Sequence, residues 1–115
     1  MDVNLSCIDL SVEDLLRCSF GLSKQEVRVL VRLLEEPAWA DVVKISSRLH
    51  RDRSVVQRGL QSLLRKGLVE RDQRNKAGGG YEYLYRAKDK RMMKASILAK
   101  SRTFSAMVSE AVRGW

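Results

Sequence analysis

The sequence of 115 residues is poor in the side chains on which catalytic and metal sites depend. It contains one histidine, His50, and two cysteines, Cys7 and Cys18, and no acid or thiol stands at ligand spacing from the histidine. Metal binding needs a cluster of such groups, and general acid–base catalysis needs a matched pair of them. We therefore predict that the protein is not an enzyme and holds no metal and no cofactor.

The sequence also lacks the features of exported and membrane-bound proteins. Two cysteines make no disulfide framework, and no apolar run approaches the roughly 20 residues that a transmembrane helix needs. The N-terminus has no basic flank of the kind that opens a signal peptide. We expect a cytoplasmic protein without membrane contact. A separate and weaker hypothesis is that Cys7 or Cys18 senses the redox state.

Positive charge is in excess and is unevenly distributed along the chain. There are 22 Lys or Arg against 14 Asp or Glu, a net charge of +8. Residues 48–91 hold 13 of the basic side chains and only five acidic ones. A basic block of this kind suits a polyanion, and nucleic acid is the first candidate.

Residues 52–67 form the most clearly marked helix. Asp52 can cap its first turn, and Gly67 can take the left-handed conformation that closes its last turn. Gly59 lies on the buried face, where we expect its missing side chain to let a second helix cross closely. The apolar residues at helical spacing on this face are Val56, Leu60, Leu63 and Leu64.

The opposite face of this helix carries basic and amide side chains and no acid after the cap. Arginine and glutamine can each form paired hydrogen bonds with a purine, and valine can contact a thymine methyl group. A solvated polar face is the alternative, and the neighbouring segments favour DNA. The predicted DNA contacts on this helix are Arg53, Ser54, Val55, Gln57, Arg58 and Gln61.

Three further helices precede this one, each opened by a capping residue. Ser11 starts a short helix, Ser23 a longer one that ends before Pro37, and Asp41 a third that runs to Leu49. An acidic residue follows three places after each serine, which is the pattern of a capping box. The predicted core residues of the second and third helices are Val27, Leu30, Val31, Leu33, Leu34, Val42, Val43, Ile45 and Leu49.

Only His50 and Arg51 separate the third helix from the cap of the fourth. Two helices joined by so tight a turn form a helix-turn-helix, in which the second helix lies exposed. The turn needs a left-handed residue, and histidine tolerates that conformation better than a β-branched residue does. We therefore interpret His50 as a turn residue and not as a metal ligand.

After Gly67 the sequence pattern changes from helical to extended. Residues 68–74 and 81–86 are predicted strands of a hairpin, joined by a tip that contains three glycines. The glycines open no helix and have no Lys-Ser or Lys-Thr after them, which argues against a nucleotide-binding loop. A basic hairpin after a helix-turn-helix is a wing, and its predicted DNA contacts are Arg71, Arg74 and Lys76.

Residues 88–113 form a long helix without proline or glycine. Its apolar residues mark a narrow seam of the kind that pairs with another helix. We predict that this seam forms a homodimer interface, and packing on the chain's own domain is the alternative. The residues of the predicted interface are Met93, Ile97, Phe104, Met107 and Ala111.

Three local motifs resemble those of TrmB-like winged helix-turn-helix regulators, an archaeal group close in design to MarR-type repressors. Gly21–Val29 is similar to the family's G-L-[ST]-x-x-E-x-x-V opening of the second helix. Residues 53–69 are similar to its R-S-x-V…L-x-x-L-x-x-K-G-L-V run, and Tyr85–Ala87 to the Y-R-A that closes the wing. The resemblance implies a mainly α fold with a small β-hairpin, and a transcriptional regulator that binds double-stranded DNA.

The sequence departs from the family pattern in two places. Where the family's turn has a glycine and then an apolar residue, this chain has His50 and Arg51, and we expect Arg51 to turn outward and join the DNA contacts. Larger members carry a sugar-binding domain after the winged helix, and from the length of this sequence we expect no such domain here. We therefore infer no sugar effector, and the existence of any effector is an open question.

The combined prediction is a sequence-specific dimeric DNA-binding transcriptional regulator. Residues 1–87 would form a winged helix-turn-helix domain and residues 88–115 a dimerisation helix. Helix 53–66 would enter the major groove, and the wing 68–86 would follow the backbone or the minor groove. The alternatives are a protein-binding winged-helix subunit of a transcription or RNA-processing complex, and RNA binding by the same basic surface.

Overall fold

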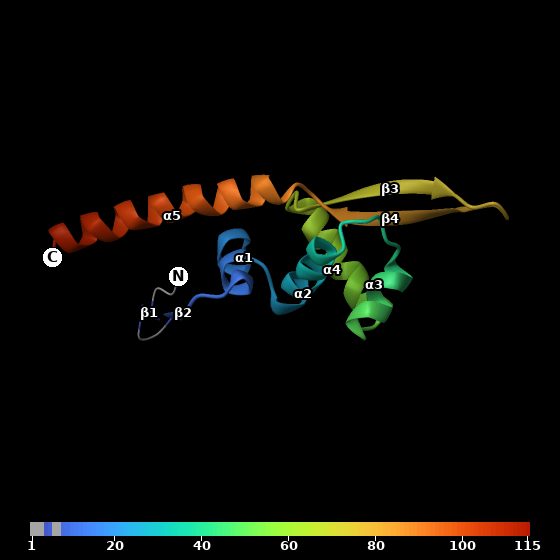
Figure 1. Cartoon of the computed structure of the whole chain (residues 1–115), viewed down its shortest axis with the longest axis horizontal. Helices are drawn as coiled ribbons and strands as arrows, with labels where there is room; N and C mark the ends of the chain where they lie inside the picture. Colours follow the sequence, from blue (N-terminus) through green and yellow to red (C-terminus); the bar gives the residue numbers. More distant parts are fainter. Residues whose placement is uncertain (1–3, 6–7) are drawn as a thin grey trace.

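The computed structural model describes residues 4, 5 and 8–115, and Figure 1 shows a long helix and a hairpin projecting from opposite ends of a helical domain. The molecule is 67 Å long and 24 and 23 Å across. No helix in the described part of the chain is long and apolar enough to cross a membrane. The elements are β1 (Asn4–Leu5), β2 (Ile8–Asp9), α1 (Val12–Phe20), α2 (Lys24–Glu35), α3 (Val42–Leu49), α4 (Arg53–Arg65), β3 (Val69–Asn75), β4 (Tyr81–Ala87) and α5 (Lys90–Arg113).

This order confirms the predicted fold class, a mainly α protein with a small hairpin. The short antiparallel pair β1–β2 was not predicted from the sequence. Cys7 lies outside the described residues, and Cys18 is exposed on α1.

The helix starts follow the predicted caps, with one exception. The backbone N–H of Asp14 donates to Ser11 Oγ at 3.1 Å, and the Ser11 hydroxyl donates to the Asp14 carboxylate at 2.9 Å. The Ser11 hydroxyl, together with the Ser11 backbone N–H that lies 3.4 Å from the same carboxylate, lowers the pKa of Asp14. Ser23 caps α2 by accepting from the N–H of Glu26 at 3.2 Å. Asp52 occupies the cap position of α4 but accepts no cap hydrogen bond, which corrects the prediction for that residue.

The core forms where α2 packs on α4. Val29 of α2, absent from the predicted core, is 2% exposed, and a Cβ on Gly59 would lie 3.5 Å from its Cγ2. That distance is ordinary van der Waals contact, so the helix crossing does not require a glycine, contrary to our expectation. Val43 of α3 is half exposed and is not a core residue. The largest fully buried side chains are Tyr85, Leu30, Ile45, Leu60, Leu63, Val56 and Val69.

The turn between α3 and α4 contains the predicted left-handed histidine. His50 has φ 52° and ψ 46°, and its N–H lies 3.4 Å from the carbonyl oxygen of Ser47. The next N–H, that of Arg51, donates to the carbonyl of Ser46 at 3.2 Å. The Arg51 side chain is exposed, as expected, and α4 follows α3 without a longer loop.

The hairpin is attached to the domain at its base. Gly67, with φ 74°, follows Lys66, the C-terminal cap of α4, and turns the chain toward β3. β3 and β4 pair antiparallel along their whole length. Ala40, in the connection between α2 and α3, exchanges two backbone hydrogen bonds with Tyr85 of β4, at 3.0 and 2.8 Å. The wing is therefore tied to the segment that leads into α3.

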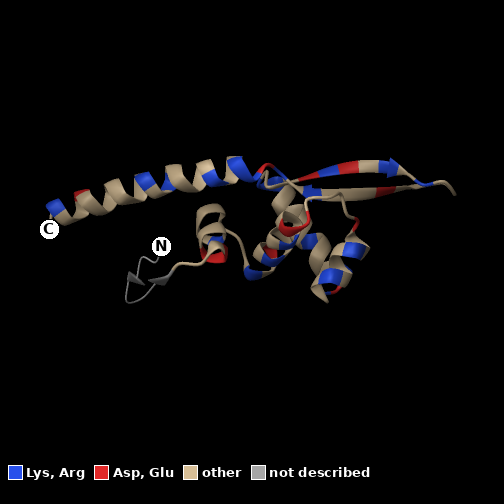
Figure 2. Cartoon of the chain, viewed as in Figure 1, with Lys and Arg blue, Asp and Glu red and all other residues tan. Residues whose placement is uncertain are grey.

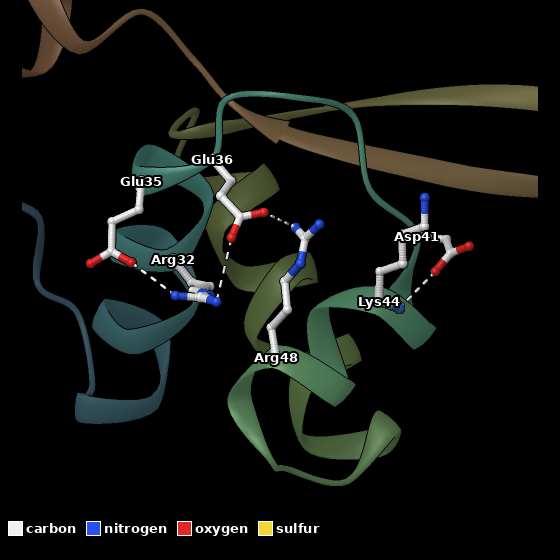
Figure 3. Close-up of polar contacts among 6 residues, drawn as sticks. All are labelled: Arg32, Glu35, Glu36, Asp41, Lys44 and Arg48. Carbon is white, nitrogen blue, oxygen red and sulfur yellow. Dashed lines mark hydrogen bonds and ion pairs between the residues drawn. The ribbon is translucent and has the colours of Figure 1, made fainter.

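An ion-pair network joins the end of α2 to α3 (Figure 3). Arg48 of α3 pairs with Glu36 at 2.9 Å. Arg32 of α2 pairs with Glu35 at 3.1 Å and with Glu36 at 3.4 Å. Glu36 therefore forms ion pairs with two guanidinium groups on different helices, and the charges of these two arginines are offset within the chain.

Helix α5 begins in the core of the domain and ends outside it (Figure 1). Met93 is 4% exposed, and Ile97 packs against the same core. One turn later, Lys100 donates to the carbonyl of Ser19 and lies 4.6 Å from the ring centroid of Phe20. All residues from 101 to 115 are exposed. The predicted seam is thus divided, because Met93 and Ile97 are core residues of this chain and not a free surface.

Candidate nucleic-acid interface

The outer face of α4 carries most of the side chains predicted to contact DNA. Arg53, Ser54, Arg58 and Gln61 are all exposed on this helix. Arg65, seven residues after Arg58, extends the same face by two turns and was not predicted. The helix therefore presents a row of basic and polar groups over most of its length.

The arginines at the start of α4 are not neutralised within the described part of the chain. No acidic group of residues 4, 5 and 8–115 forms an ion pair with Arg51, Arg53 or Arg58. A guanidinium group has five N–H donors in a planar fork, and it matches both phosphates and the guanine edge. Arg51, Arg53 and Arg58 are therefore available to bind phosphates or guanine.

Two of the predicted contacts on α4 are less accessible than the others. Val55 and Gln57 are half-buried at the sides of the helix. Nε2 of Gln57 donates to the hydroxyl oxygen of Tyr85 at 3.4 Å, so this amide is held by the wing. The second N–H and the carbonyl oxygen of the Gln57 amide are not used in that bond.

The two faces of the wing differ in what they carry. Directly opposed residues share a face, so Arg71 lies on the face of its partner Tyr85, whose side chain is fully buried and reaches α4. Tyr83 and Tyr81 follow at intervals of two on this face. The Arg71 guanidinium lies 4.1 Å from the centroid of the Tyr83 ring, and Tyr81 packs edge-on against Tyr83. An arginine–tyrosine row thus extends outward from the core.

The other two predicted wing contacts are placed differently from Arg71. Acidic and basic residues alternate along β3 (Figure 2), and Nε of Arg74 lies 3.6 Å from the carboxylate of Asp72 on the opposite face of the hairpin. Lys76 is exposed at the tip, where its backbone N–H donates to the carbonyl of Gly80 at 3.0 Å. Lys76 extends the wing's positive charge, whereas Arg74 is partly neutralised.

The sequence contained a signal for the residues that were missed. In Y-E-Y-L-Y, strand alternation places Tyr81, Tyr83 and Tyr85 on one face. Arg65 stands at helical spacing from Arg58, and the same rule would have found it.

The C-terminal end of α4 is anchored to α2. Nζ of Lys66 donates to the carbonyl of Gly21 and to the carboxylate of Glu26, both at 2.9 Å. Burial by itself raises the pKa of Glu26, but the hydrogen bond and charge of Lys66, with hydrogen bonds from Ser62 and Ser23, outweigh it and lower the pKa. Lys66 is therefore a cation of the α4 segment that is already paired.

The outer part of α5 presents the remaining predicted interface residues to solvent. Phe104 is 64% exposed and Met107 65%, and Ala111 lies one turn farther along the same stripe. Val12 and Leu15 of α1 are also exposed. Further large exposed apolar side chains on α5 are Leu98, Val108 and Val112.

Comparison with known proteins connects this geometry to transcription regulators. The family model of the sugar-specific transcriptional regulator TrmB matches residues 16–91. The uncharacterized protein MJ1082 of Methanocaldococcus jannaschii is 43% identical over 79 residues, which are 69% of this chain and 64% of that protein. The aligned part is thus less than two thirds of that relative's length.

Solved structures share the fold. A protein from Methanosarcina mazei, described as a possible transcriptional regulator, has a TM-score of 0.81 and 29% identity, with 100% of this chain and 97% of that chain covered. A mutant of S. aureus MepR bound to an oligodeoxyribonucleotide has a TM-score of 0.57 and 18% identity, with coverage of 90% and 72%. At that identity the second likeness concerns the winged-helix fold alone.

Proposed function

Because the chain belongs to the TrmB family of transcriptional regulators, we propose that it acts by binding specific sites on double-stranded DNA as a homodimer. The unpaired cationic face of α4, which follows the tight turn at His50, is the observation that carries this proposal. Helix α4 enters the major groove, and the wing lies along the backbone or the minor groove. The helix-turn-helix and the wing form the DNA-binding part, and the exposed residues 101–115, which include the outer part of α5, form the dimerisation surface.

The contacts divide between reading bases and holding phosphates. Arg53 and Arg58 can each form paired hydrogen bonds with a guanine, and Gln61 can do so with an adenine. Arg51 and Ser54 lie beside them at the N-terminal end of α4, where backbone phosphates approach the helix. The apolar side chain of Val55 can contact a thymine methyl group.

The wing supplies affinity that depends on salt. Arg71 and Lys76 contact phosphates, because each carries its charge beyond the body of the domain. The rings of Tyr83 and Tyr81 support Arg71 in an extended position. Arg74 contributes less, since Asp72 offsets its charge.

Binding of genomic DNA fragments tests the DNA proposal. The purified full chain is mixed with sheared genomic duplex at about 150 mM salt, and the retained fragments are sequenced. We expect enrichment of a short motif with two related halves, since a dimer reads two half-sites about one helical turn apart. Uniform retention, or retention only at low salt, would reduce the function to non-specific binding.

Dimerisation uses the part of α5 that the domain does not cover. The same helical stripe that places Met93 and Ile97 in the core continues as Phe104, Met107 and Ala111 beyond it. A row of exposed apolar side chains is unfavourable in water, and such a row is typical of a protein–protein interface. A second copy of α5 offers the matching row.

Phe104→Glu tests this interface, with Ser109→Glu as the control. Both positions are exposed on α5, but Ser109 lies on the other side of the helix from Phe104. We expect Phe104→Glu to give folded monomers in sedimentation and to weaken binding of a two-half site by about 10²-fold or more. Ser109→Glu should stay dimeric. Dissociation of both variants, or of neither, would place the interface elsewhere.

A protein-binding winged helix is the second candidate, and the exposed stripe on α5 is what favours it. In that case the cations of α4 would be solvated and would serve no ligand. Binding to heparin and to random duplex at low salt separates the two functions. Competition between DNA and RNA duplexes of one sequence then separates DNA binding from RNA binding.

A further inference from the structure

Gln57 and Tyr85 form the one side-chain hydrogen bond between α4 and the wing among the described residues. They stand 28 positions apart in the sequence. We propose that the Tyr85 hydroxyl orients the Gln57 amide and thereby sets the base preference at one position of the DNA site. This inference rests on the proposed function and assigns Tyr85 as a positioning residue, buried away from the DNA.

Tyr85 is a fixed reference point within the fold. Its side chain is fully buried, and its backbone N–H and carbonyl are both bonded to Ala40, at 2.8 and 3.0 Å. The following residue, Arg86, forms an ion pair with Glu70 and lies 4.4 Å from the Trp39 ring centroid. Neither the ring nor the strand can shift without disturbing these contacts.

The buried hydroxyl keeps the Gln57 amide against the wing. Its side-chain hydrogen-bond partner in the described part of the chain is Nε2 of Gln57, and a buried hydroxyl without a partner is unfavourable. If the amide turned away, the hydroxyl would lose this bond and stay cut off from water. The Gln57 side chain is thus restrained before any DNA arrives.

An amide held in this way has a defined donor and acceptor left over. One N–H points to Tyr85, which leaves the second N–H and the carbonyl oxygen of Gln57. An adenine in the major groove offers N7 as acceptor and N6–H as donor, the pattern that this remaining pair matches. Gln57 lies half-buried at the edge of α4, beside the exposed row that contains Arg58 and Gln61. We therefore expect it to read the outermost base pair on the wing side of each half-site.

The test compares base preferences of variants that change the anchor or the amide. Tyr85→Phe removes the hydroxyl and retains the ring, and Gln57→Ala removes the amide and retains the tyrosine. Each variant selects from a pool of randomised duplexes, and the discrimination at every position is compared with that of the wild type. We expect each variant to lose about tenfold discrimination at the same single position, with the salt slope unchanged.

The double variant and Gln61→Ala supply the controls. Adding Tyr85→Phe to Gln57→Ala should change nothing further, because the hydroxyl acts only through that amide. Adding it to Gln61→Ala should give independent effects, since the Gln61 amide has no bond to the wing among the described residues. Thermal unfolding of each variant confirms that the fold is retained.

The outcomes separate this inference from the proposed function. If Tyr85→Phe lowers affinity equally for all sequences, the residue supports the fold and does not set preference. If Gln57→Ala leaves the preference as in the wild type, the inference is overturned even though DNA binding stands. If the wild type selects no sequence at all, the proposed function itself fails.

Discussion

The arginines of α3 and of α4 lie on adjacent helices of one helix-turn-helix and have opposite surroundings. Arg48 on α3 forms an ion pair with Glu36, which also pairs with Arg32 (Figure 3). Arg53 and Arg58 on α4 have no acidic partner in the described part of the chain. Arginine on α3 therefore joins two helices through an ion pair, whereas the arginines on α4 remain available to bind a ligand.

The presence or absence of an acidic partner decides which of these cations can bind a phosphate or a base. A guanidinium paired with a carboxylate has its charge offset, whereas an exposed one without an acidic partner gains most from a phosphate or a base. The wing repeats the contrast, with Arg74 beside Asp72 and Arg71 stacked on Tyr83. Net charge alone, at +8 for the chain, does not reveal which cations are available.

The largest effect is expected from Arg58→Ala or Arg53→Ala. Each should weaken binding of the selected DNA site by about 1–3 kcal/mol if the arginine forms paired bonds with a base. Random duplex should lose less. Titration of a labelled site and of a scrambled duplex measures both quantities.

Arg48→Ala is the matched control on α3. It removes an arginine whose charge Glu36 already offsets, so DNA affinity should change by less than about twofold, and stability by about 1 kcal/mol at most. If Arg48→Ala lowers DNA affinity as much as Arg58→Ala does, then pairing with an acid does not predict which arginines bind DNA.

The wing tip gives the next effect in size. Replacing residues 75–80 by a short turn removes Lys76 and should leave the fold intact, because these residues are exposed. With one phosphate contact fewer, the slope of log affinity against log salt should become shallower by about one. Equal slopes for the wild type and the truncated chain would argue against a wing contact.

Much of the fold could be predicted because its signals are local. Serine caps, the change from helical to alternating pattern and the three-residue connection around His50 each depend on neighbouring residues. The left-handed conformation of His50 and the turn at Gly67 followed from that pattern and are present. Asp52 shows the limit, since its side chain does not make the expected cap bond.

The remaining features depend on contacts between residues distant in sequence. The bond of Gln57 to Tyr85 and the pairing of Ala40 with β4 leave no local pattern. The apolar spacing on α5 keeps the same phase on both sides of Lys100, which interrupts it, so periodicity could not show that its first part packs on the chain's own core. The pairing of Arg48 depends on such packing too, because its partner Glu36 lies at the end of a different helix.

The two faces of the wing should differ in effect, with Arg71 equal to the wing tip and Arg74 smaller. Arg71→Ala removes an arginine without an acidic partner among the described residues, so the salt slope should become shallower by about one. Arg74→Ala removes one that lies 3.6 Å from Asp72 and frees that carboxylate, so any loss should come from added repulsion and not from a lost contact. Asp72→Asn combined with Arg74→Ala should then restore most of the affinity. Failure to restore it would make Arg74 a direct contact.

The smallest effect concerns Lys66, a paired cation that belongs to the end of α4 itself. It bonds Glu26 and the carbonyl of Gly21, both at 2.9 Å. If pairing, and not position on α4, decides the role of a cation, Lys66→Met should leave DNA affinity within about twofold of the wild type. It should lower stability at neutral pH by at most about 1 kcal/mol, because the lysine is one-third exposed.

The pH dependence of that loss identifies the Lys66–Glu26 pair as its source. The pKa of Glu26 is lowered in the folded chain, so the pair stabilises the fold above the ordinary pKa of a glutamate. This contribution is lost as the pH falls through the lowered pKa, where Glu26 takes up a proton. Urea unfolding of the wild type and of Lys66→Met should therefore differ at pH 7 and converge in acid. If the difference in stability between the wild type and Lys66→Met stays constant with pH, the effect comes from the bond with Gly21. If Lys66→Met lowers DNA affinity as much as Arg58→Ala does, paired and unpaired cations do not differ in function.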